Sequence, residues 1–267
     1  MRVRRGAVNR QVLRLISIAS VPLLTSCNSA TNQVLEETFE QLYAISPSAK
    51  ITINNGDGAV LVYGSDVNEM RVHAVKRAYS RARLTQIAVS VDLKPGAVSI
   101  DTKFPPKPKW GLFDRSSTVD YTIVVPANVD ISELHLDAGE ILLDGMRGPT
   151  TRAWLGEGRM FARNCFTNLD LAIRRGNLIM SYDWWEQSKF SVEANIAQGN
   201  AWAYLSSDAA FHLLAKTGEG KILSDFESAA QASARGMQID ALVNGGGDAT
   251  IKLSVAKGNV KVAEANP

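Results

Sequence analysis

Apolar and polar residues alternate with a period of two along most of the chain after residue 48, the pattern of strands with one buried face. Six such segments precede residue 130: 51–55, 59–64, 69–75, 87–93, 97–104 and 119–125. Turn-forming residues separate them, such as the Asn-Gly-Asp-Gly of residues 55–58. Three prolines interrupt the pattern within residues 105–117, where a loop is expected because proline cannot donate to a central strand. The pattern predicts an all-β fold with a β-rich part over residues 49–130.

A repeat with a glycine at its centre begins at residue 131 and continues to about residue 263. Its copies are 134–143, 154–162, 171–180, 192–205, 213–223 and 242–253, with 254–262 as a shorter last copy. The marker glycines are Gly139, Gly158, Gly176, Gly199, Gly220 and Gly247. A single copy cannot bury its apolar face, but a stack of copies can share one core. The repeat predicts a β-solenoid-like stack of short strands with glycine turns; a β-sandwich is the alternative, since strand spacing does not separate the two.

Residues 1–26 have the layout of a bacterial lipoprotein signal peptide. Five arginines and no acid lie in the first 14 residues, and an apolar run too short to span a bilayer follows. The Leu-Thr-Ser-Cys that ends at Cys27 resembles the lipobox, in which the cysteine becomes the acylated N-terminus. Two or three acyl chains anchor a protein stably, whereas one gives marginal binding. We expect lipid attachment at Cys27 and a tether over residues 27–48; a secretory signal with an incidental cysteine is the alternative.

Charge and cysteine content narrow the classes of function. The chain has 29 Lys and Arg against 27 Asp and Glu, but without the five signal arginines 24 basic residues face 27 acidic ones. Net charge therefore gives no argument for binding nucleic acid. With Cys27 acylated, Cys165 is the one remaining thiol, so no disulfide scaffold is expected. Stability must come from a packed core, for which the chain is long enough.

Three stretches then occur in an order that resembles a known family. Residues 36–78 read as strand, Asn-Gly-Asp turn, strand, Gly-Ser-Asp turn and basic strand; residues 119–151 contain a Val-Pro corner; the glycine-turn repeats follow. Together they resemble the DUF4097-type candidate adhesins, β-strand-repeat proteins of bacterial envelopes. The resemblance implies a β-solenoid-like fold and an envelope location, and it supplies no catalytic residues. In this chain several turns read Ala-Gly-Glu, Arg-Gly-Asn or Gln-Gly-Asn in place of the family's usual Asn-Gly-Asp.

The segment TGEGKILS, residues 217–224, superficially resembles a phosphate-binding loop. Such a loop requires a glycine five residues before Gly220 and a Ser or Thr after Lys221, but Ala215 and Ile222 stand there. A strand-like sequence follows where the loop would need a helix. Residues 156–158 repeat the Gly-Glu-Gly, so the segment is interpreted as a repeat turn, and no nucleotide is expected.

Candidate metal and catalytic residues are sparse. His73, His135 and His212 each stand alone in a strand pattern, and residues 245–253 lack the tandem spacing of a calcium-binding repeat, so we predict no metal and no cofactor. Glu157 and Glu219 occupy matching turns, and Asp137 and Glu140 lie near another. Because a glycosidase needs two carboxyl groups about 5–10 Å apart, they leave a polysaccharide hydrolase or lyase as the alternative function.

The aromatic residues suggest a binding surface. Tyr182 and Trp202 are 20 residues apart, as are Trp184 and Tyr204, close to the length of one repeat. Aromatic residues in one column of neighbouring coils would stack as a ladder. Trp184 and Trp185, if exposed, would form a platform for sugar rings or for the apolar side chains of a partner; packing in the core is the alternative.

A second candidate surface is basic. Lys107, Lys109 and Trp110 in the proline-rich loop could contact anionic headgroups, although a solvated loop is the simpler interpretation. The sequence as a whole predicts a non-catalytic interaction protein of the cell envelope, acting in adhesion, scaffolding or sensing. Its expected partners are the membrane, through the lipid, and an envelope protein or glycan. The outer membrane is favoured, because Asn28 replaces the aspartate typical of inner-membrane retention.

Overall fold

The computed structural model describes residues 34–265 except 107–116 and 230–236. Apart from α1 (Arg81–Gln86) and a helical segment at 227–229, the regular elements of this part are strands, which confirms the all-β prediction. The strands are β1 (Leu35–Ala44), β2 (Lys50–Ser65), β3 (Glu69–Ala78), β4 (Ala88–Lys94), β5 (Ala97–Lys103), β6 (Thr118–Pro126), β7 (Asp130–Asp144), β8 (Thr150–Arg163), β9 (Asn168–Ser181), β10 (Ser191–Leu205), β11 (Phe211–Glu219), β12 (Ile222–Ser224), β13 (Gln238–Val243), β14 (Thr250–Lys257) and β15 (Val260–Glu264).

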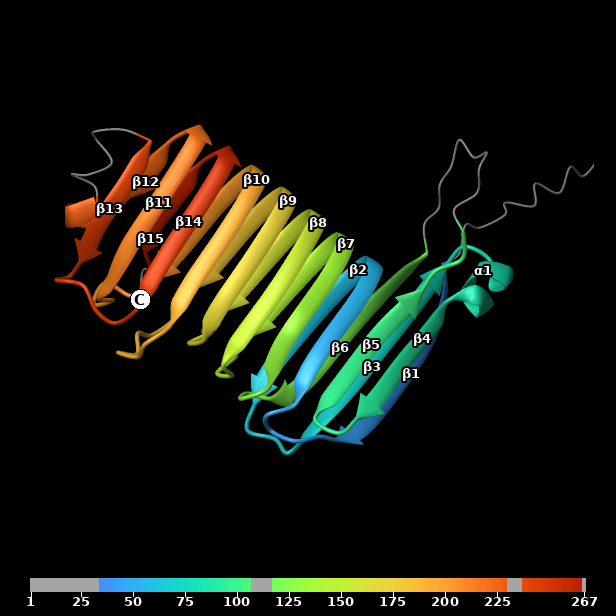
Figure 1. Ribbon diagram of the computed structural model, residues 1–267. Coiled ribbons are helices and arrows are strands. Elements are labelled where there is room, and N and C mark those ends of the chain that lie inside the picture. The colour runs from blue at the N-terminus through green and yellow to red at the C-terminus, as the bar shows by residue number, and fades with distance from the viewer. Residues whose placement is uncertain (1–33, 107–116, 230–236, 266–267) are drawn as a thin grey trace, which may run out of the picture. The chain divides into compact units, whose positions relative to one another are not determined.

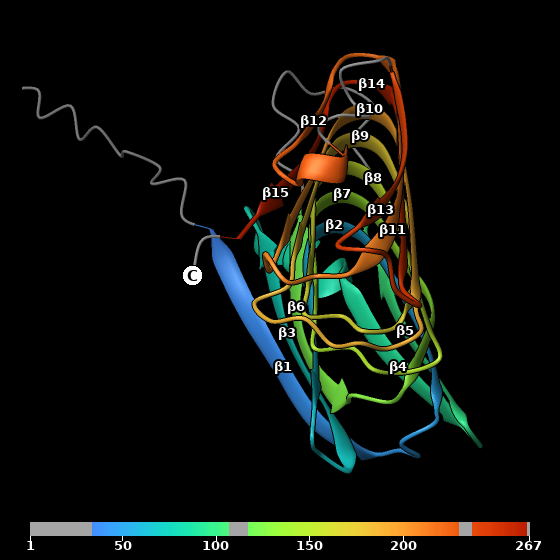
Figure 2. The same ribbon diagram turned by 90° about the vertical axis from the view of Figure 1, so that its left-hand side faces the viewer.

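The repeating unit is one long strand that bends over at a glycine. Strands β7, β8, β9 and β10 each have 14 or 15 residues and pair in parallel, so that the glycines at the bends lie opposite one another. Viewed along the stack, each of these strands forms an arch (Figure 2). Strand β2 has the same bend at Gly58, which pairs with Gly139 of β7. The predicted stack of glycine-turn strands is therefore present, and β2 is part of it.

Glycine is required at these bends for two reasons. Gly199 has a φ of +138°, a conformation that L side chains rarely adopt. A Cβ atom at Gly199 would also lie 1.6 Å from the carbonyl oxygen of Gly176 in the neighbouring coil. The coils can approach to the spacing of paired strands only where no side chain stands between them.

The core lies between the two halves of each arch. In β8, Leu155 before the bend and Met160 after it are both fully buried. Along each half of the strand, buried side chains alternate with more exposed ones. The same alternation in each coil joins the inward side chains into one hydrophobic cluster. Two strand layers thus pack face to face over a shared core, which is also the layering of a β-sandwich.

The last coil of the chain lies inside the stack, not at its end. Strands β14 and β15, joined at Gly258, pair on one side with the two halves of β10 and on the other with β11 and β12. The spatial order is therefore β10, then β14 with β15, then β11 with β12, and then β13, as Figure 1 shows. The interpretation of Gly247 as a bend was wrong, because Gly258 is the bend and Gly247 lies in the loop between β13 and β14. Residues 254–262 are consequently the middle of a full coil.

Asparagine side chains explain this order. Asn177, Asn200 and Asn259 each follow a bend glycine, and the Oδ1 atom of one accepts a backbone N–H bond of 3.0 Å from the next, in that sequence. The Oδ1 atom of Asn259 then accepts the N–H of Lys221 at 3.0 Å. Lysine has no side-chain acceptor with which to continue the ladder. The ladder therefore ends at the coil with Lys221, which lies after the three asparagine coils although it precedes Asn259 in the chain.

Both ends of the stack are closed by antiparallel strands. Strand β1 pairs with β3, which pairs with β6, and the β4–β5 hairpin extends the first half of β2. At the opposite end β13 pairs with β11. Residues 35–44, part of the expected tether, thus form the edge strand β1. Such caps keep the edges of a solenoid from pairing with other chains.

Several predictions fall on other parts of the chain. The signal residues 1–26, Cys27 and the segment with Lys107, Lys109 and Trp110 lie outside the described residues. Among the residues that are described, no helix combines the length and the apolarity needed to cross a bilayer.

Candidate functional site

Two of the predicted aromatic residues belong to the core. Tyr182 is fully buried, and its hydroxyl donates a 2.9 Å hydrogen bond to the carbonyl oxygen of Cys165. Burial raises the pKa of Tyr182 well above its usual value, so the phenol stays neutral. Trp185 packs against this core, with its ring centroid 5.6 Å from that of Tyr182 and 5.6 Å from that of Phe211. These two rings close the loop end of the arches.

Trp184 is the exposed member of the same group. Its side chain is 46% exposed, and its Nε1 atom donates a 2.8 Å hydrogen bond to Glu186. Arg147 forms a bidentate ion pair with Glu186, with one bond of 2.9 Å, and this pairing lowers the pKa of the Glu186 carboxyl. The Arg147 guanidinium also lies 4.5 Å from the ring centroid of Phe166. Trp184 is thus held in place with part of its ring in solvent.

Trp202 and Tyr204 lie in other columns. In the β9–β10 register, Trp202 is opposite Ile179 and Tyr204 is opposite Ser181. The reason is coil length: Gly176 and Gly199 are 23 residues apart, so a spacing of 20 does not return to the same column. Trp202 instead continues an outward stripe of half-buried apolar side chains on the second halves of the coils, formed by Leu61, Leu142, Phe161, Ile179 and Trp202. The structure brings Tyr182, Trp184 and Trp185 together and leaves Trp202 apart from them, while the backbone carbonyl of Tyr204 accepts the Tyr182 N–H at 3.0 Å. The role of these residues in binding stays a prediction.

Glu157 and Glu219, the carboxylates of the two matching turns, do not form the pair that a glycosidase needs. In the neighbouring turn of β7, Asp137 contacts His135 at 3.1 Å and Glu140 pairs with Arg159 at 3.0 Å. Glu157 and Glu219 share a row of the sheet, but four inter-coil steps separate them, about 19 Å at the usual strand spacing. The two carboxyl groups of a glycosidase lie within about 10 Å of each other. Each is also paired with a cation on the adjacent coil: Glu157 with Arg175 at 3.1 Å and Glu219 with Lys257 at 3.4 Å.

Cys165 and two of the three histidines are engaged in structural contacts. Cys165 is buried, and burial raises the pKa of its thiol to about 12, so little reactive thiolate forms at neutral pH. His212 contacts Asp240 at 2.7 Å, and His135 contacts Asp137 at 3.1 Å. Among the described residues, His, Cys, Asp and Glu form no group of three that could hold a metal ion.

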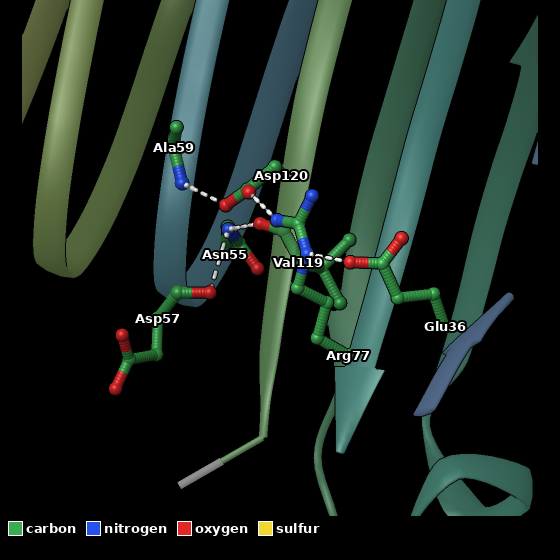
Figure 3. A network of polar contacts seen from close by, with 7 residues as sticks. All are labelled: Glu36, Asn55, Asp57, Ala59, Arg77, Val119 and Asp120. Carbon is green, nitrogen blue, oxygen red and sulfur yellow. Dashed lines mark hydrogen bonds and ion pairs between the residues drawn. The ribbon is translucent and has the colours of Figure 1, made fainter. Parts of the chain in front are cut away.

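A polar network closes the first bend of the stack. Its residues are Glu36, Asn55, Asp57, Ala59, Arg77, Val119 and Asp120 (Figure 3). Asp120 accepts the N–H of Ala59, the residue after the bend glycine, at 2.8 Å, which is the role that asparagine has in later coils. Asp120 also pairs with Arg77, whose Nε atom donates to Glu36 at 2.6 Å. The network caps the first bend and ties β1 and β3 to it, so it serves the fold.

A groove crosses the outer face of the first halves of four neighbouring coils. It has a volume of about 670 Å³, in the range of ligand sites, and extends over β9, β10, β14 and β11. Register places Ala172, Asn195 and Ser254 in one row across these coils. Small residues beside that row complete the floor: Ala197, Gly218 and Ala256. The floor is low because short side chains recur at outward positions of adjacent coils.

Trp154 of β8 forms one end of the groove. One face of its indole stacks on His135, with ring centroids 4.2 Å apart and an angle of 13° between the planes. The other face is directed along the stack towards Ala172, the partner of Trp154 in β9. A methyl group cannot cover an indole, so an apolar ring face remains available to a ligand.

The polar groups of the groove include an unpaired hydroxyl and two cations. Ser254 is only 8% exposed, and its Oγ atom makes no hydrogen bond within the described part of the chain, although a buried hydroxyl normally has a partner. Arg174 and Lys216 line the groove, and neither forms an ion pair with a described residue. The arrangement provides an aromatic face and two cations outside salt bridges on one surface, above a buried hydroxyl, and it suits binding better than catalysis.

Sequence reasoning missed this groove. The available signal was a run of small residues at outward positions, such as Ala172, Ser254 and Ala256, together with the bulky Trp154. To use it, one must know that β14 lies beside β10, and the chain order conceals this.

The structure thus defines an all-β, solenoid-like protein with a groove on one face. No family model and no curated protein sequence matches the chain. A solved structure from Clostridium sporogenes, of a candidate cell adhesion protein, has a TM-score of 0.50 at 13% identity and covers 86% of this chain and 100% of the other. A candidate adhesin from Bacteroides fragilis, with 10% identity and coverages of 86% and 97%, has a TM-score of 0.28. The likeness to the Clostridium protein shows a shared fold, while the DUF4097 assignment stays a prediction.

Proposed function

We propose that this protein is a lipid-anchored, non-catalytic adhesion protein of the bacterial cell envelope that binds its partner through the Trp154 groove. The observation that carries the proposal is the indole face of Trp154 that is not stacked on His135, beside a floor of short side chains. The fold shared with a candidate cell adhesion protein supports the adhesion role. The lipobox-like sequence at Cys27 supports the anchor.

A polysaccharide hydrolase or lyase is a weaker explanation of the same molecule. Its catalysis would require two nearby carboxyl groups, and Glu157 and Glu219, the pair suggested by their matching turns, lie four coils apart and are each neutralised by a cation. The groove itself is lined by Arg174 and Lys216 and by no carboxylate. We therefore assign the groove to binding.

The anchor is tested by Cys27→Ser. Because the acyl chains would attach to the cysteine sulfur and the new amine, this substitution should move the protein from the membrane fraction to the soluble fraction, with the signal peptide uncleaved or cleaved elsewhere. Fractionation with immunoblotting and mass spectrometry of the mature N-terminus measures both effects. A variant that stays in the membrane fraction with the wild-type N-terminal mass would contradict the lipid anchor.

The groove is tested by Trp154→Ala in the Cys27→Ser protein, immobilised and exposed to bacterial cells. Loss of a tryptophan that anchors a ligand typically weakens binding by roughly thirtyfold, so cell retention should fall close to background. Phe161→Ala is the matched control, since Phe161 is a half-buried aromatic residue of the same strand on the other face. Equal retention by the two variants, or no retention by the unsubstituted protein, would refute adhesion through this groove.

A further inference from the structure

Charges around the groove cancel except in its middle. On one side Glu193 pairs with Lys252 at 2.8 Å, and on the other Glu157 and Glu219 pair with cations of adjacent coils. Arg174 and Lys216 lie between these rows without an ion-pair partner among the described residues. The groove therefore carries two positive charges outside any salt bridge of the described residues, of which Lys216 also helps to lower the pKa of the nearby Glu193 carboxyl, on a chain whose portion after the signal has more acids than bases.

The positions of these groups suit a long, ring-containing anion. Trp154 and Lys216 mark the two ends of one row, four inter-coil steps apart, which corresponds to about 19 Å. The indole offers a flat apolar surface at one end, and the Asn195 side chain, which also bonds the Glu193 carboxylate, lies between the ends. A guanidinium such as that of Arg174 can hold a carboxylate with two parallel hydrogen bonds.

We infer that the groove binds an acidic polysaccharide, a chain of sugar rings that carry carboxylates, with one ring on Trp154 and the carboxylates at Arg174 and Lys216. A peptide is disfavoured because the floor is the outer face of paired strands, whose backbone N–H and C=O groups are already bonded within the sheet, so β-strand addition has no free edge there. This inference rests on the proposed function, since it assigns a ligand class to the same groove.

The first experiment compares three polymers as probes of the purified Cys27→Ser protein by calorimetry or affinity electrophoresis. Polygalacturonate has rings and carboxylates, dextran has rings alone, and polyglutamate has carboxylates alone. We expect binding to polygalacturonate that weakens with added salt, and at least tenfold weaker binding to the other two. Equal binding to polyglutamate would show that charge alone suffices, and equal binding to dextran would show that the cations do not matter; either result overturns the inference, as does the absence of binding to polygalacturonate.

Variants then locate the site. Trp154→Ala should weaken polygalacturonate binding by roughly thirtyfold, and the double variant Arg174→Gln with Lys216→Gln should weaken it and flatten its salt dependence. The double variant Lys189→Gln with Lys261→Gln removes the same charge away from the groove and should change neither. Unchanged binding by Trp154→Ala, or equal effects of the two double variants, would place the ligand elsewhere.

A variant that fills the groove tests whether loss of binding results from loss of folding. Ala172→Phe adds a ring against the free indole face, so it should block the groove while leaving the melting temperature unchanged or higher. Retained polygalacturonate binding by Ala172→Phe would contradict the inference. Cell retention that depends on Trp154 without any polygalacturonate binding would overturn the ligand class and leave the proposed adhesion intact. Polygalacturonate binding without cell retention would support the ligand class and refute the proposed adhesion.

Discussion

Deletion of residues 250–267 should leave no folded, shortened stack. The deletion removes β14 and β15 from between β10 and β11 with β12, so it opens the middle of the core. The apolar residues lost include five that are almost completely buried: Ile251, Leu253, Val255, Val260 and Val262. Each contributes about 1.5–3 kcal/mol when fully buried. Their sum is comparable with the whole free energy of unfolding of a typical domain, about 5–15 kcal/mol.

Circular dichroism, size-exclusion chromatography and thermal melting measure the outcome. The truncated chain should be aggregated or should lack a cooperative transition, because two long strand edges become unpaired. Deletion of residues 27–44 is the control, because β1 is an edge strand with no fully buried side chain. A monomeric 1–249 chain that melts cooperatively near the wild-type temperature would mean that the last coil is terminal and that the order of coils is wrong.

Gly199→Ala should destabilise the protein far more than an ordinary glycine substitution. The new methyl group would lie 1.6 Å from the carbonyl oxygen of Gly176, so two coils must separate at the bend. Separation also breaks the adjoining hydrogen bonds of 3.0 Å that link Asn200 to Asn177. We expect a loss of more than about 4 kcal/mol in the free energy of unfolding, a size confined to severe core or backbone disruption.

Gly96→Ala separates the two reasons for glycine at a bend. Gly96 also has a positive φ, +74°, but a Cβ atom there meets nothing within 4 Å. Its substitution should cost only the backbone term, about 1–2 kcal/mol. Urea unfolding of both variants gives the two free energies. Similar losses would show that the contact between coils does not determine the effect at Gly199.

Local sequence determined most of the strands and bends. Alternation with a period of two marks strands wherever one face is buried, and this condition holds for β7 to β10. A bend with positive φ requires glycine, so five of the six marker glycines, from Gly139 to Gly220, lie at bends. Gly247 was misassigned because a run of three glycines in a loop has the same composition as a bend.

Predictions that needed the register between coils were less successful. Trp202 was expected beside Tyr182 on a 20-residue period, but the loop before β10 lengthens that coil to 23 residues. The loop at the open end of each arch can vary in length, and the apolar–polar alternation within the strands does not depend on that length. A loop can therefore shift every column without changing the predicted strands.

The amino-acid sequence by itself determined that this protein is an all-β stack of arched strands, because periodicity and glycine geometry act between near neighbours in the chain. Only the tertiary structure decided which coils are adjacent. The asparagine ladder places Asn259 beside Asn200 across 59 residues of sequence, and that long-range contact inserts the last coil into the stack. The insertion brings Ser254 between Asn195 and Lys216 and so completes the groove beside Trp154. The site depends on the order of the coils, and hydrogen bonds between distant residues set that order.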